Sequence, residues 1–405
     1  MKKCNLRLFI VVSCIVLLPF SAMAADVIKI GSLVSTTGDL AAYGPPINNG
    51  GLLAEQDINN AGGVLGHNIK IILRDTQTNP TAAVDAAKKL VEIDKVVGIA
   101  GALSSGVTIP VATSVSIPSN VVQISPASTS EKITTLNDND YIFRTVAMDA
   151  LQAPALAQVL FNDKNFRKIS IIYVNNDYGE GLAKGLKASF EKMGGQVMAL
   201  VPYNKQQASY KGEAQKATAE KPQAIVMIAY PQFGAMIMRQ TVEMGYKGAF
   251  AYADGMKAPE VAKNVGTKYV ENTFGTVAAN PNQELTGWFK NHYKDKFGEM
   301  PPKPYIDTQY DAVVLMALAM AKGGTATRQA VHDNLRRVAN APGIKVDARN
   351  LAKAFQLIKE GKEIDYDGVS GSCDFDKYGD VPGSFEVWKF SKGSIETVSY
   401  ITVGQ

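Results

Sequence analysis

The sequence predicts an α/β protein of two domains, each built on a parallel sheet covered by helices. Three observations predict this class. Short runs rich in β-branched residues alternate with segments of helical periodicity from residue 27 onward. This alternation begins a second time after residue 144, and the chain becomes helix-rich after residue 276. Strands that alternate with helices form parallel sheets, because each helix carries the chain back to the same edge.

The first domain begins with four expected strands separated by three helices. The middle helix has a clear start, since Asn79 is suited to cap it and Pro80 to occupy its first position. The strands are expected at 27–30, 69–73, 96–99 and 121–124, and the helices at 47–61, 80–94 and 106–115.

The second domain repeats this pattern and is followed by a group of helices. Its helices are expected at 151–162 and 180–193, with others between the later strands, and its strands at 169–174, 197–201, 224–228 and 249–252. Four more helices are expected at 283–297, 308–322, 327–338 and 350–360. The first domain has few helices for its sheet, so we expect the chain to return to it after building the second.

The first 24 residues have the pattern of an export signal. Lys2, Lys3 and Arg7 precede an apolar run over 8–20, and small residues lead to an expected cleavage after Ala24. The apolar run of about 13 residues is short for a membrane span, which needs roughly 20. We therefore expect a soluble, exported protein.

Cleavage of this signal changes the cysteine count and the charge. Cys4 and Cys14 would leave with the signal, so Cys373 would remain without a partner for an internal disulfide and is expected to be a buried, inert thiol. The formal net charge of the full chain is +4, and loss of three basic residues would lower it to +1. A nearly neutral protein gives no indication of a nucleic-acid partner.

Motifs that bind cofactors or metals are missing from the expected turns. The stretch 100–112 follows the third strand but lacks the lysine of a phosphate-binding loop, and 31–38 lacks the Gly-x-Gly-x-x-Gly of a dinucleotide site. The segment 374–380 resembles a calcium loop only faintly, because Phe385 stands where a bidentate glutamate is needed. We expect no cofactor and no metal.

Serine chemistry is a remote alternative for the same stretch. Hydrolysis by Ser104 or Ser105 would need a general base, and the chain beyond the signal contains only His67, His292 and His332. None of these histidines lies near a catalytic motif. We therefore expect no catalytic residues and a protein that is not an enzyme.

Two turns are instead suited to receive an anion. The stretch 100–112 follows the third expected strand and leads into a helix, whose first backbone N–H groups are unpaired and partly positive. Ser105 and Thr108 can add hydroxyl donors there, and Thr129 can do so after the next strand. Helix capping alone would explain either turn, but two turns at the carboxyl ends of successive parallel strands are typical of a ligand crevice.

Four segments carry a resemblance to a known family. They are 41–44 (AAYG), 50–63 (GGLLAEQDINNAGG), 124–129 (ISPAST) and 178–183 (YGEGLA). Through them the chain resembles the type I periplasmic binding proteins of branched-chain amino acid ABC transporters, over essentially the whole sequence beyond the signal. This resemblance implies two Rossmann-like lobes joined by three hinge crossovers near 145–149, 275–279 and 381–385. Lobe 1 would comprise 25–147 plus 277–383, and lobe 2 would comprise 148–276 plus 384–405.

The resemblance also implies a ligand site between the lobes. The Ser105 hydroxyl, together with the N–H and hydroxyl of Thr129, would meet a ligand carboxylate, and the Ala127 carbonyl would accept a hydrogen bond from an ammonium. Asp254 in the other lobe would pair with that ammonium, which would be costly to bury alone. Aromatic walls are implied at Tyr43, Tyr178, Tyr230 and Tyr305.

The function implied is a monomeric periplasmic receptor that closes on an aliphatic or branched-chain amino acid. The receptor would deliver this small-molecule ligand to a membrane ABC permease. Tyr305 is bulkier and more polar than an apolar wall, so the preferred side chain of the ligand stays open. An aromatic carboxylate or a short amide or urea is the main alternative, and these ligands lack the ammonium that Asp254 would receive.

Overall fold

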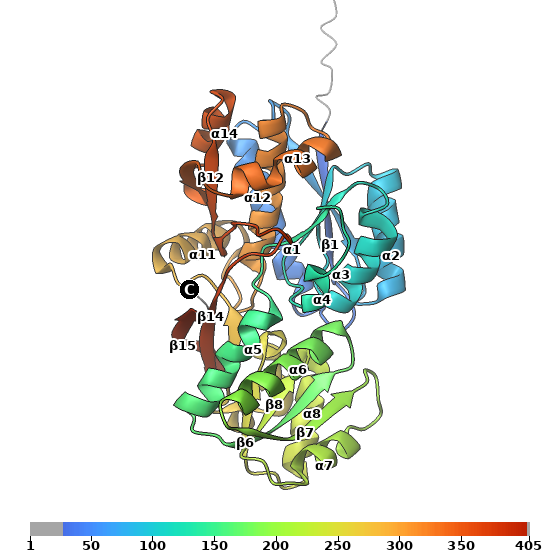
Figure 1. Cartoon of the computed structure of the whole chain (residues 1–405), viewed down its shortest axis with the longest axis vertical. Coiled ribbons are helices and arrows are strands. Elements are labelled where there is room, and N and C mark those ends of the chain that lie inside the picture. Colours follow the sequence, from blue (N-terminus) through green and yellow to red (C-terminus); the bar gives the residue numbers. More distant parts are fainter. Residues whose placement is uncertain (1–26, 403–405) are drawn as a thin grey trace, which may run out of the picture.

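The computed structural model describes residues 27–402, and the expected signal peptide, 1–24, lies outside the described residues. The described elements form two lobes arranged one above the other (Figure 1). The expected α/β class with two lobes is confirmed. Among the described helices, none has the length and apolar character needed to cross a membrane.

Lobe 1 is built on a five-stranded parallel sheet with the strand order β2-β1-β3-β4-β5. The strands are β1 (Ile28–Val34), β2 (Ile69–Asp75), β3 (Gly98–Gly101), β4 (Val122–Ser125) and β5 (Ile142–Arg144). The helices between them are α1 (Gly44–Asn60), α2 (Pro80–Lys88), α3 (Ser105–Val111) and α4 (Glu131–Thr134). As expected, the Asn79 side chain caps α2 by accepting a hydrogen bond from the N–H of Ala82.

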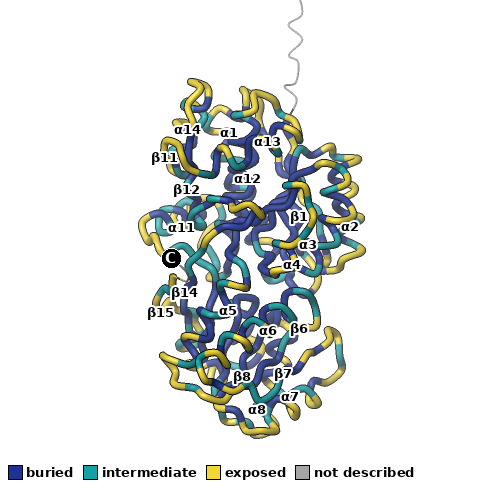
Figure 2. The backbone as a smooth tube through the Cα atoms, in the orientation of Figure 1, coloured by how far each residue is buried: buried dark blue, intermediate teal, exposed yellow. Residues whose placement is uncertain are grey.

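The chain returns to lobe 1 with four helices, as the shortage of covering helices predicted. These are α11 (Gln283–Phe297), α12 (Ile306–Gly323), α13 (Arg328–Ala339) and α14 (Leu351–Lys359). Helix α12 packs between α1 and α13, and every residue over 308–320 is buried. A helix that is buried on all sides belongs in the interior of a domain, and Figure 2 shows α12 in the centre of the lobe. A small sheet of β11 (Ile344–Asp347), β12 (Ile364–Gly368) and β13 (Gly371–Ser372) adjoins these helices.

Lobe 2 is built on a seven-stranded sheet with the order β15-β14-β10-β9-β8-β6-β7. Its parallel strands are β6 (Lys168–Val174), β7 (Gln196–Tyr203), β8 (Ala224–Ile228), β9 (Ala249–Tyr252) and β10 (Phe274–Ala278). The antiparallel strands β14 (Ser384–Ser391) and β15 (Ser394–Thr402) complete it at the β10 edge. The helices are α5 (Asp149–Gln158), α6 (Asp177–Lys192), α7 (Lys211–Thr218), α8 (Pro231–Glu243), α9 (Pro259–Val265) and α10 (Thr267–Val270).

The chain crosses between the lobes three times. The first crossing lies between β5 and α5. The second begins after Ala278, because 274–278 form β10 and pair with β9 and β14. The third ends before Ser384, where β14 begins its pairing with β15. Each crossing is therefore short and is anchored by a strand or helix on at least one side.

A buried ion pair ties the first crossing to the third. Arg144 at the end of β5 is fully buried, and its Nε donates to the Asp380 carboxylate, whose side chain is 3% exposed. The same guanidinium donates to the backbone carbonyls of Ser128 and Ser130 at 3.3 and 2.9 Å, and to the hydroxyl of Thr134. Arg144 thus holds the loop after β4 in place from within the protein.

Cys373 lies directly after β13, the last strand of the small sheet. The thiol is free and buried, as the sequence predicted, and burial raises its pKa well above the usual value. A protonated, inaccessible thiol is unreactive.

Candidate functional site

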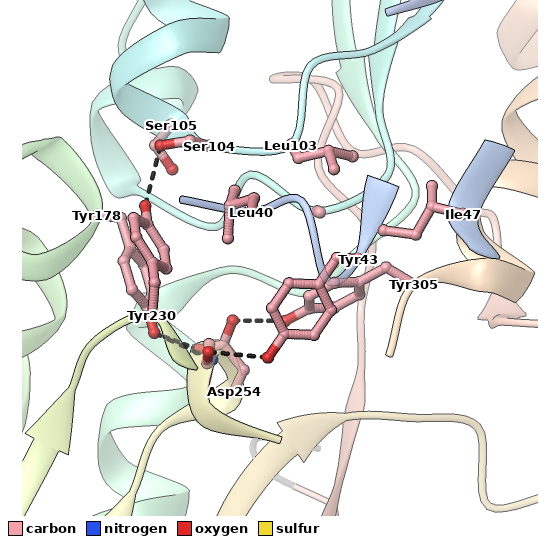
Figure 3. A pocket seen from close by; sticks show the side chains of 12 residues that line it. Leu40, Tyr43, Ile47, Leu103, Ser104, Ser105, Tyr178, Tyr230, Asp254 and Tyr305 are labelled. Atoms are coloured by element: carbon pink, nitrogen blue, oxygen red, sulfur yellow. Dashed lines mark hydrogen bonds between the residues drawn. The ribbon is translucent and has the colours of Figure 1, made fainter. Parts of the chain in front are cut away.

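A small cavity lies between the two lobes, at the carboxyl ends of the parallel strands. The space is lined by Leu40, Tyr43, Ile47, Leu103, Ser104, Ser105, Ala127, Tyr178, Tyr230, Asp254, Gly255 and Tyr305. Seven of the eight residues expected in the site are among them, and the eighth, Thr129, is not. Figure 3 shows Tyr178 and Tyr230 between the two serines and Asp254, and Tyr43 and Tyr305 on the other side of Asp254.

The position of Ser104 and Ser105 in the cavity wall depends on the close approach of β1 and β3. Gly101 ends β3 with φ +148°, and a Cβ atom there would lie 2.2 Å from the carbonyl oxygen of Leu33 in β1. Only glycine therefore allows β3 to run this close to β1 before the chain turns. Ser104 then adopts an extended conformation at the helix cap, and Ser105 becomes the first residue of α3.

The Ser105 hydroxyl is held so that it can donate. Its oxygen accepts the N–H of Ser130 at 3.2 Å. The loop that carries Ser130 is bound to the same turn, because the Ser125 hydroxyl donates to the Ala102 carbonyl at 2.7 Å and accepts from the N–H of Ser128 at 3.0 Å. This leaves the Ser105 proton available for a group in the cavity. Thr108, which was expected to add a donor, instead bonds the Ser128 hydroxyl at 2.7 Å and does not line the cavity.

Asp254 is a buried carboxylate at the opposite end of the cavity. The Tyr178 hydroxyl donates to one carboxylate oxygen at 2.7 Å, and the Tyr305 hydroxyl donates to the other at 2.6 Å. Burial raises the pKa of Asp254, although both tyrosine hydrogen bonds oppose that rise. A carboxylate offers about four acceptor positions, so two tyrosine bonds leave room for a further donor.

Tyrosine hydroxyls connect the two lobes across this cavity. Tyr43 in lobe 1 donates to the Gly255 carbonyl in lobe 2 at 2.9 Å, and the hydroxyls of Ser104 and Tyr230 bond each other at 3.0 Å. The Tyr305 bond to Asp254 also crosses between the lobes. The structure is therefore a closed form, with the two sides of the cavity in direct contact.

Loss of one of these bonds is expected to open the ligand-free protein. In the Tyr43→Phe variant the Gly255 carbonyl loses its donor, which costs about 1 kcal/mol and changes the ratio of closed to open molecules about fivefold. Small-angle X-ray scattering should then show a larger average radius of gyration. Tyr246→Phe is the matched control, since that hydroxyl bonds the carbonyls of Pro222 and Ala249 within lobe 2. Equal radii for the two variants would contradict a role in closure.

Apolar side chains form the part of the site that sequence reasoning missed. Leu40, Ile47 and Leu103 line the cavity on the lobe 1 side, and the backbone of Gly255 lines it on the lobe 2 side. No motif marks these residues, because an isolated leucine or isoleucine beside a helix is indistinguishable in sequence from a core residue. Ser104 was considered only as a nucleophile, and its hydroxyl is bound to Tyr230.

The three histidines all lie away from the cavity. His67 bridges Val64 in a turn, His292 bonds Asp57, and the ring of His332 packs at a tilt against Tyr141. Within residues 27–402 no group of acidic, cysteine or histidine side chains is arranged to hold a metal ion. The polar groups that line the cavity offer hydrogen bonds and one negative charge.

A family model described as periplasmic binding protein matches residues 27–359. The chain belongs to the periplasmic binding protein family. The leucine-, isoleucine-, valine-, threonine- and alanine-binding protein of Pseudomonas aeruginosa is 28% identical over 83% of this chain and 90% of that protein. The relationship to branched-chain amino acid binding proteins, indicated by four short segments of the sequence, is thereby confirmed. These relatives are binding proteins, and this periplasmic binding protein is likewise not an enzyme.

Solved structures show the same fold. The leucine binding protein LivK of Thermotoga maritima superposes with a TM-score of 0.79 at 24% identity, covering 93% of this periplasmic binding protein and 99% of that chain. A solute binding protein of Rhodopseudomonas palustris in complex with benzoate superposes with a TM-score of 0.77 at 15% identity, covering 93% and 97%.

Proposed function

We propose that this protein is a periplasmic receptor that closes on an aliphatic or branched-chain amino acid and delivers it to a membrane ABC permease. In this proposal the signal peptide 1–24 is removed on export and the receptor acts as a monomer. The observation that carries the proposal is the buried Asp254 carboxylate, which faces Ser105 across a cavity closed by both lobes. One end of the cavity offers donors and the other offers a negative charge, as a zwitterion requires.

In the proposed binding mode the ligand carboxylate meets lobe 1 and its ammonium is shared between the two lobes. Ser105 and the loop at Thr129 receive the carboxylate, the Ala127 carbonyl accepts from the ammonium, and Asp254 neutralises the ammonium charge. The apolar side chain of the ligand packs on the lobe 1 wall formed by Leu40, Ile47 and Leu103.

Closure of the two lobes follows from the fact that each lobe supplies part of the ligand's contacts. A ligand bound to one lobe gains its remaining hydrogen bonds only when the second lobe reaches it, so binding favours the closed form. The three short crossings are the segments that must flex during this hinge motion. Tyr43, Tyr178, Tyr230 and Tyr305 supply aromatic surface from both lobes, and Tyr178 and Tyr230 stack with ring centres 5.8 Å apart.

An aromatic carboxylate is the second candidate ligand. It is supported by the tyrosine walls and by the benzoate bound to the Rhodopseudomonas palustris neighbour. Such a ligand brings no positive charge to Asp254, whose carboxylate would stay buried without a cation at an energetic cost. An amino acid is therefore the preferred candidate ligand.

A thermal-shift screen of amino acids, aromatic acids, and short amides and ureas tests the proposal. At 100 times its dissociation constant a ligand adds roughly 2.7 kcal/mol of stability, so leucine or valine is expected to raise the melting temperature clearly. Ser105→Ala should remove most of this response, whereas Ser170→Ala, a buried serine in β6, should not. A response to benzoate without any response to amino acids would overturn the amino acid in favour of the second candidate.

A further inference from the structure

The cavity between the closed lobes is too small for the ligand proposed for it. Its volume is about 30 Å³, and a single water molecule needs about 10–15 Å³. Cavities that bind small molecules commonly measure about 300–1,000 Å³. An amino acid can therefore bind in the closed protein only if a side chain that lines the cavity moves aside, or if the lobes close less far.

A larger cavity lies on the hinge side of the molecule, beside the second crossing at Ala279 and Asn280. This hinge cavity has a volume of about 260 Å³. Lobe 1 contributes Phe289 and Met300 to its walls, and lobe 2 contributes Ile395. The hinge cavity therefore combines apolar surface with enough room to take up a side chain from a neighbouring site.

Tyr305 lies between the ligand cavity and the hinge cavity. Among the residues that the structure describes, it alone lines both of them. Its hydroxyl reaches into the ligand cavity and donates to the Asp254 carboxylate at 2.6 Å (Figure 3). In the proposed binding mode the ligand's ammonium approaches this same carboxylate. Tyr305 therefore competes with the ammonium for the Asp254 end of the cavity.

The backbone of Tyr305 holds this side chain in an unfavourable conformation. With φ 73° and ψ 13° the residue is left-handed, which crowds the Cβ atom of any residue other than glycine. Strain of this kind is concentrated at sites where a residue changes between two states. Movement of the ring away from Asp254 would allow the backbone to relax.

Two of the other tyrosines, Tyr178 and Tyr230, are held more firmly than Tyr305. Their rings stack with centres 5.8 Å apart, and each hydroxyl takes part in two hydrogen bonds. Within the described residues the Tyr305 hydroxyl takes part in one, and so does that of Tyr43, which does not line the hinge cavity. Of the four tyrosines, Tyr305 therefore combines weak attachment with a space beside it.

We propose that Tyr305 is a gate that the ligand displaces, and that its side chain turns out of the ligand cavity and into the hinge cavity on binding. This inference rests on the proposed function and specifies how the same site is controlled. The hydroxyl that leaves Asp254 finds acceptors in the hinge cavity, where Asp307 and Glu386 present carboxylates. Asp254 thus exchanges the Tyr305 hydroxyl for the ligand's ammonium, and both cavities take part in binding.

The first test fills the hinge cavity. Thr286 of α11 lines it, and the Thr286 hydroxyl donates to the Asn282 carbonyl at 2.9 Å. In Thr286→Phe the added ring takes the space that Tyr305 needs, so isothermal titration should show leucine binding weakened about tenfold or more. Thr218→Phe is the matched control and should bind leucine like the wild type. Thr218 of α7 lines an outer hollow of lobe 2, and its hydroxyl bonds the Ala214 carbonyl in the same way at 2.8 Å.

A double variant shows whether this loss acts through Tyr305. Tyr305→Gly removes the ring, and glycine suits the positive φ. Thr286→Phe added to Tyr305→Gly should leave the leucine affinity within about threefold of Tyr305→Gly alone, because the ring that needs the space is gone. An equal loss in both backgrounds would mean that Thr286→Phe distorts the protein, and would overturn the gate.

The third test removes only the hydroxyl of Tyr305. Tyr305→Phe keeps the ring but lacks the bond to Asp254, which in the wild type has to break before the ligand binds. Leucine should therefore bind about three- to tenfold more tightly than to the wild type. A hydroxyl that contacts the ligand in the bound state would give the opposite sign.

The results separate this inference from the proposed function. Weaker binding in Thr286→Phe that disappears in the Tyr305→Gly background, together with tighter binding in Tyr305→Phe, supports the gate. Leucine affinity unchanged in Thr286→Phe, unchanged or weaker in Tyr305→Phe, or lost in Tyr305→Gly overturns the gate and leaves the proposed function standing. A wild-type protein that binds no amino acid overturns the proposed function itself, and this inference with it.

Discussion

Replacing Asp254 with asparagine is expected to weaken the binding of leucine or valine by two to three orders of magnitude. The carboxylate is fully enclosed by the cavity and the two tyrosines, so its charge is opposed by little water once a ligand is bound. Removing one partner of a buried charge pair costs about 3–5 kcal/mol, and each 1.4 kcal/mol corresponds to a factor of ten in affinity. Isothermal titration of wild type and variant measures the difference.

The control for this variant is another acidic residue that joins the lobes. Asp177 pairs with Lys132 at 2.7 Å at the rim of the cavity, where its side chain is 30% exposed. Exposed ion pairs contribute little free energy, so Asp177→Asn should change the affinity for leucine only a few-fold. If Asp254→Asn also bound leucine within threefold of the wild type, the ammonium of leucine would not be paired with Asp254.

Replacing Arg144 with methionine is expected to destabilise the fold by about 3–5 kcal/mol. The change leaves the Asp380 carboxylate buried without its cation and removes the donors to the Ser128 and Ser130 carbonyls. Urea unfolding followed by circular dichroism measures the loss. Arg239→Met, which removes a surface pair with Glu243 within α8, should have almost no effect.

A double variant separates charge from packing in this prediction. Asp380→Asn in the Arg144→Met background removes the stranded charge, so it should recover part of the lost stability. A double variant less stable than Arg144→Met alone would show that the hydrogen bond from the Thr134 hydroxyl to the Asp380 carboxylate outweighs the cost of the buried charge.

Clear sequence signals marked many of the helices and strands. The strands at 224–228 and 249–252 and the helix at 283–297 begin and end where the sequence predicted, and Asn282 caps that helix by accepting from the N–H of Leu285. By contrast β5 has three residues and β10 contains a glycine, so neither resembles a strand until neighbouring strands pair with it. Pairing partners are decided by tertiary structure, which local patterns do not record.

The site was predictable where a recognisable motif carried it and not elsewhere. Resemblance located seven lining residues, but the apolar wall of Leu40, Ile47 and Leu103 has no pattern of its own, and neither has the burial of Asp149. An aspartate in the first turn of a helix is ordinarily a favourable surface position, and only the packing of the lobes shows that Asp149 is enclosed. Tyr305 adopts a left-handed conformation with φ 73°, which no local signal indicated for a tyrosine.

The Arg144 ion pair has a mechanical consequence for the hinge. Because one guanidinium binds both the loop after β4 and Asp380, the chain up to residue 380 is held to lobe 1. In the proposed hinge motion the third crossing can therefore flex only over the three residues before β14. There Gly383 is packed so tightly that a Cβ atom would lie 2.3 Å from the Cβ of Ala147 in the first crossing. We expect this contact between the two crossings to be the pivot of the proposed motion.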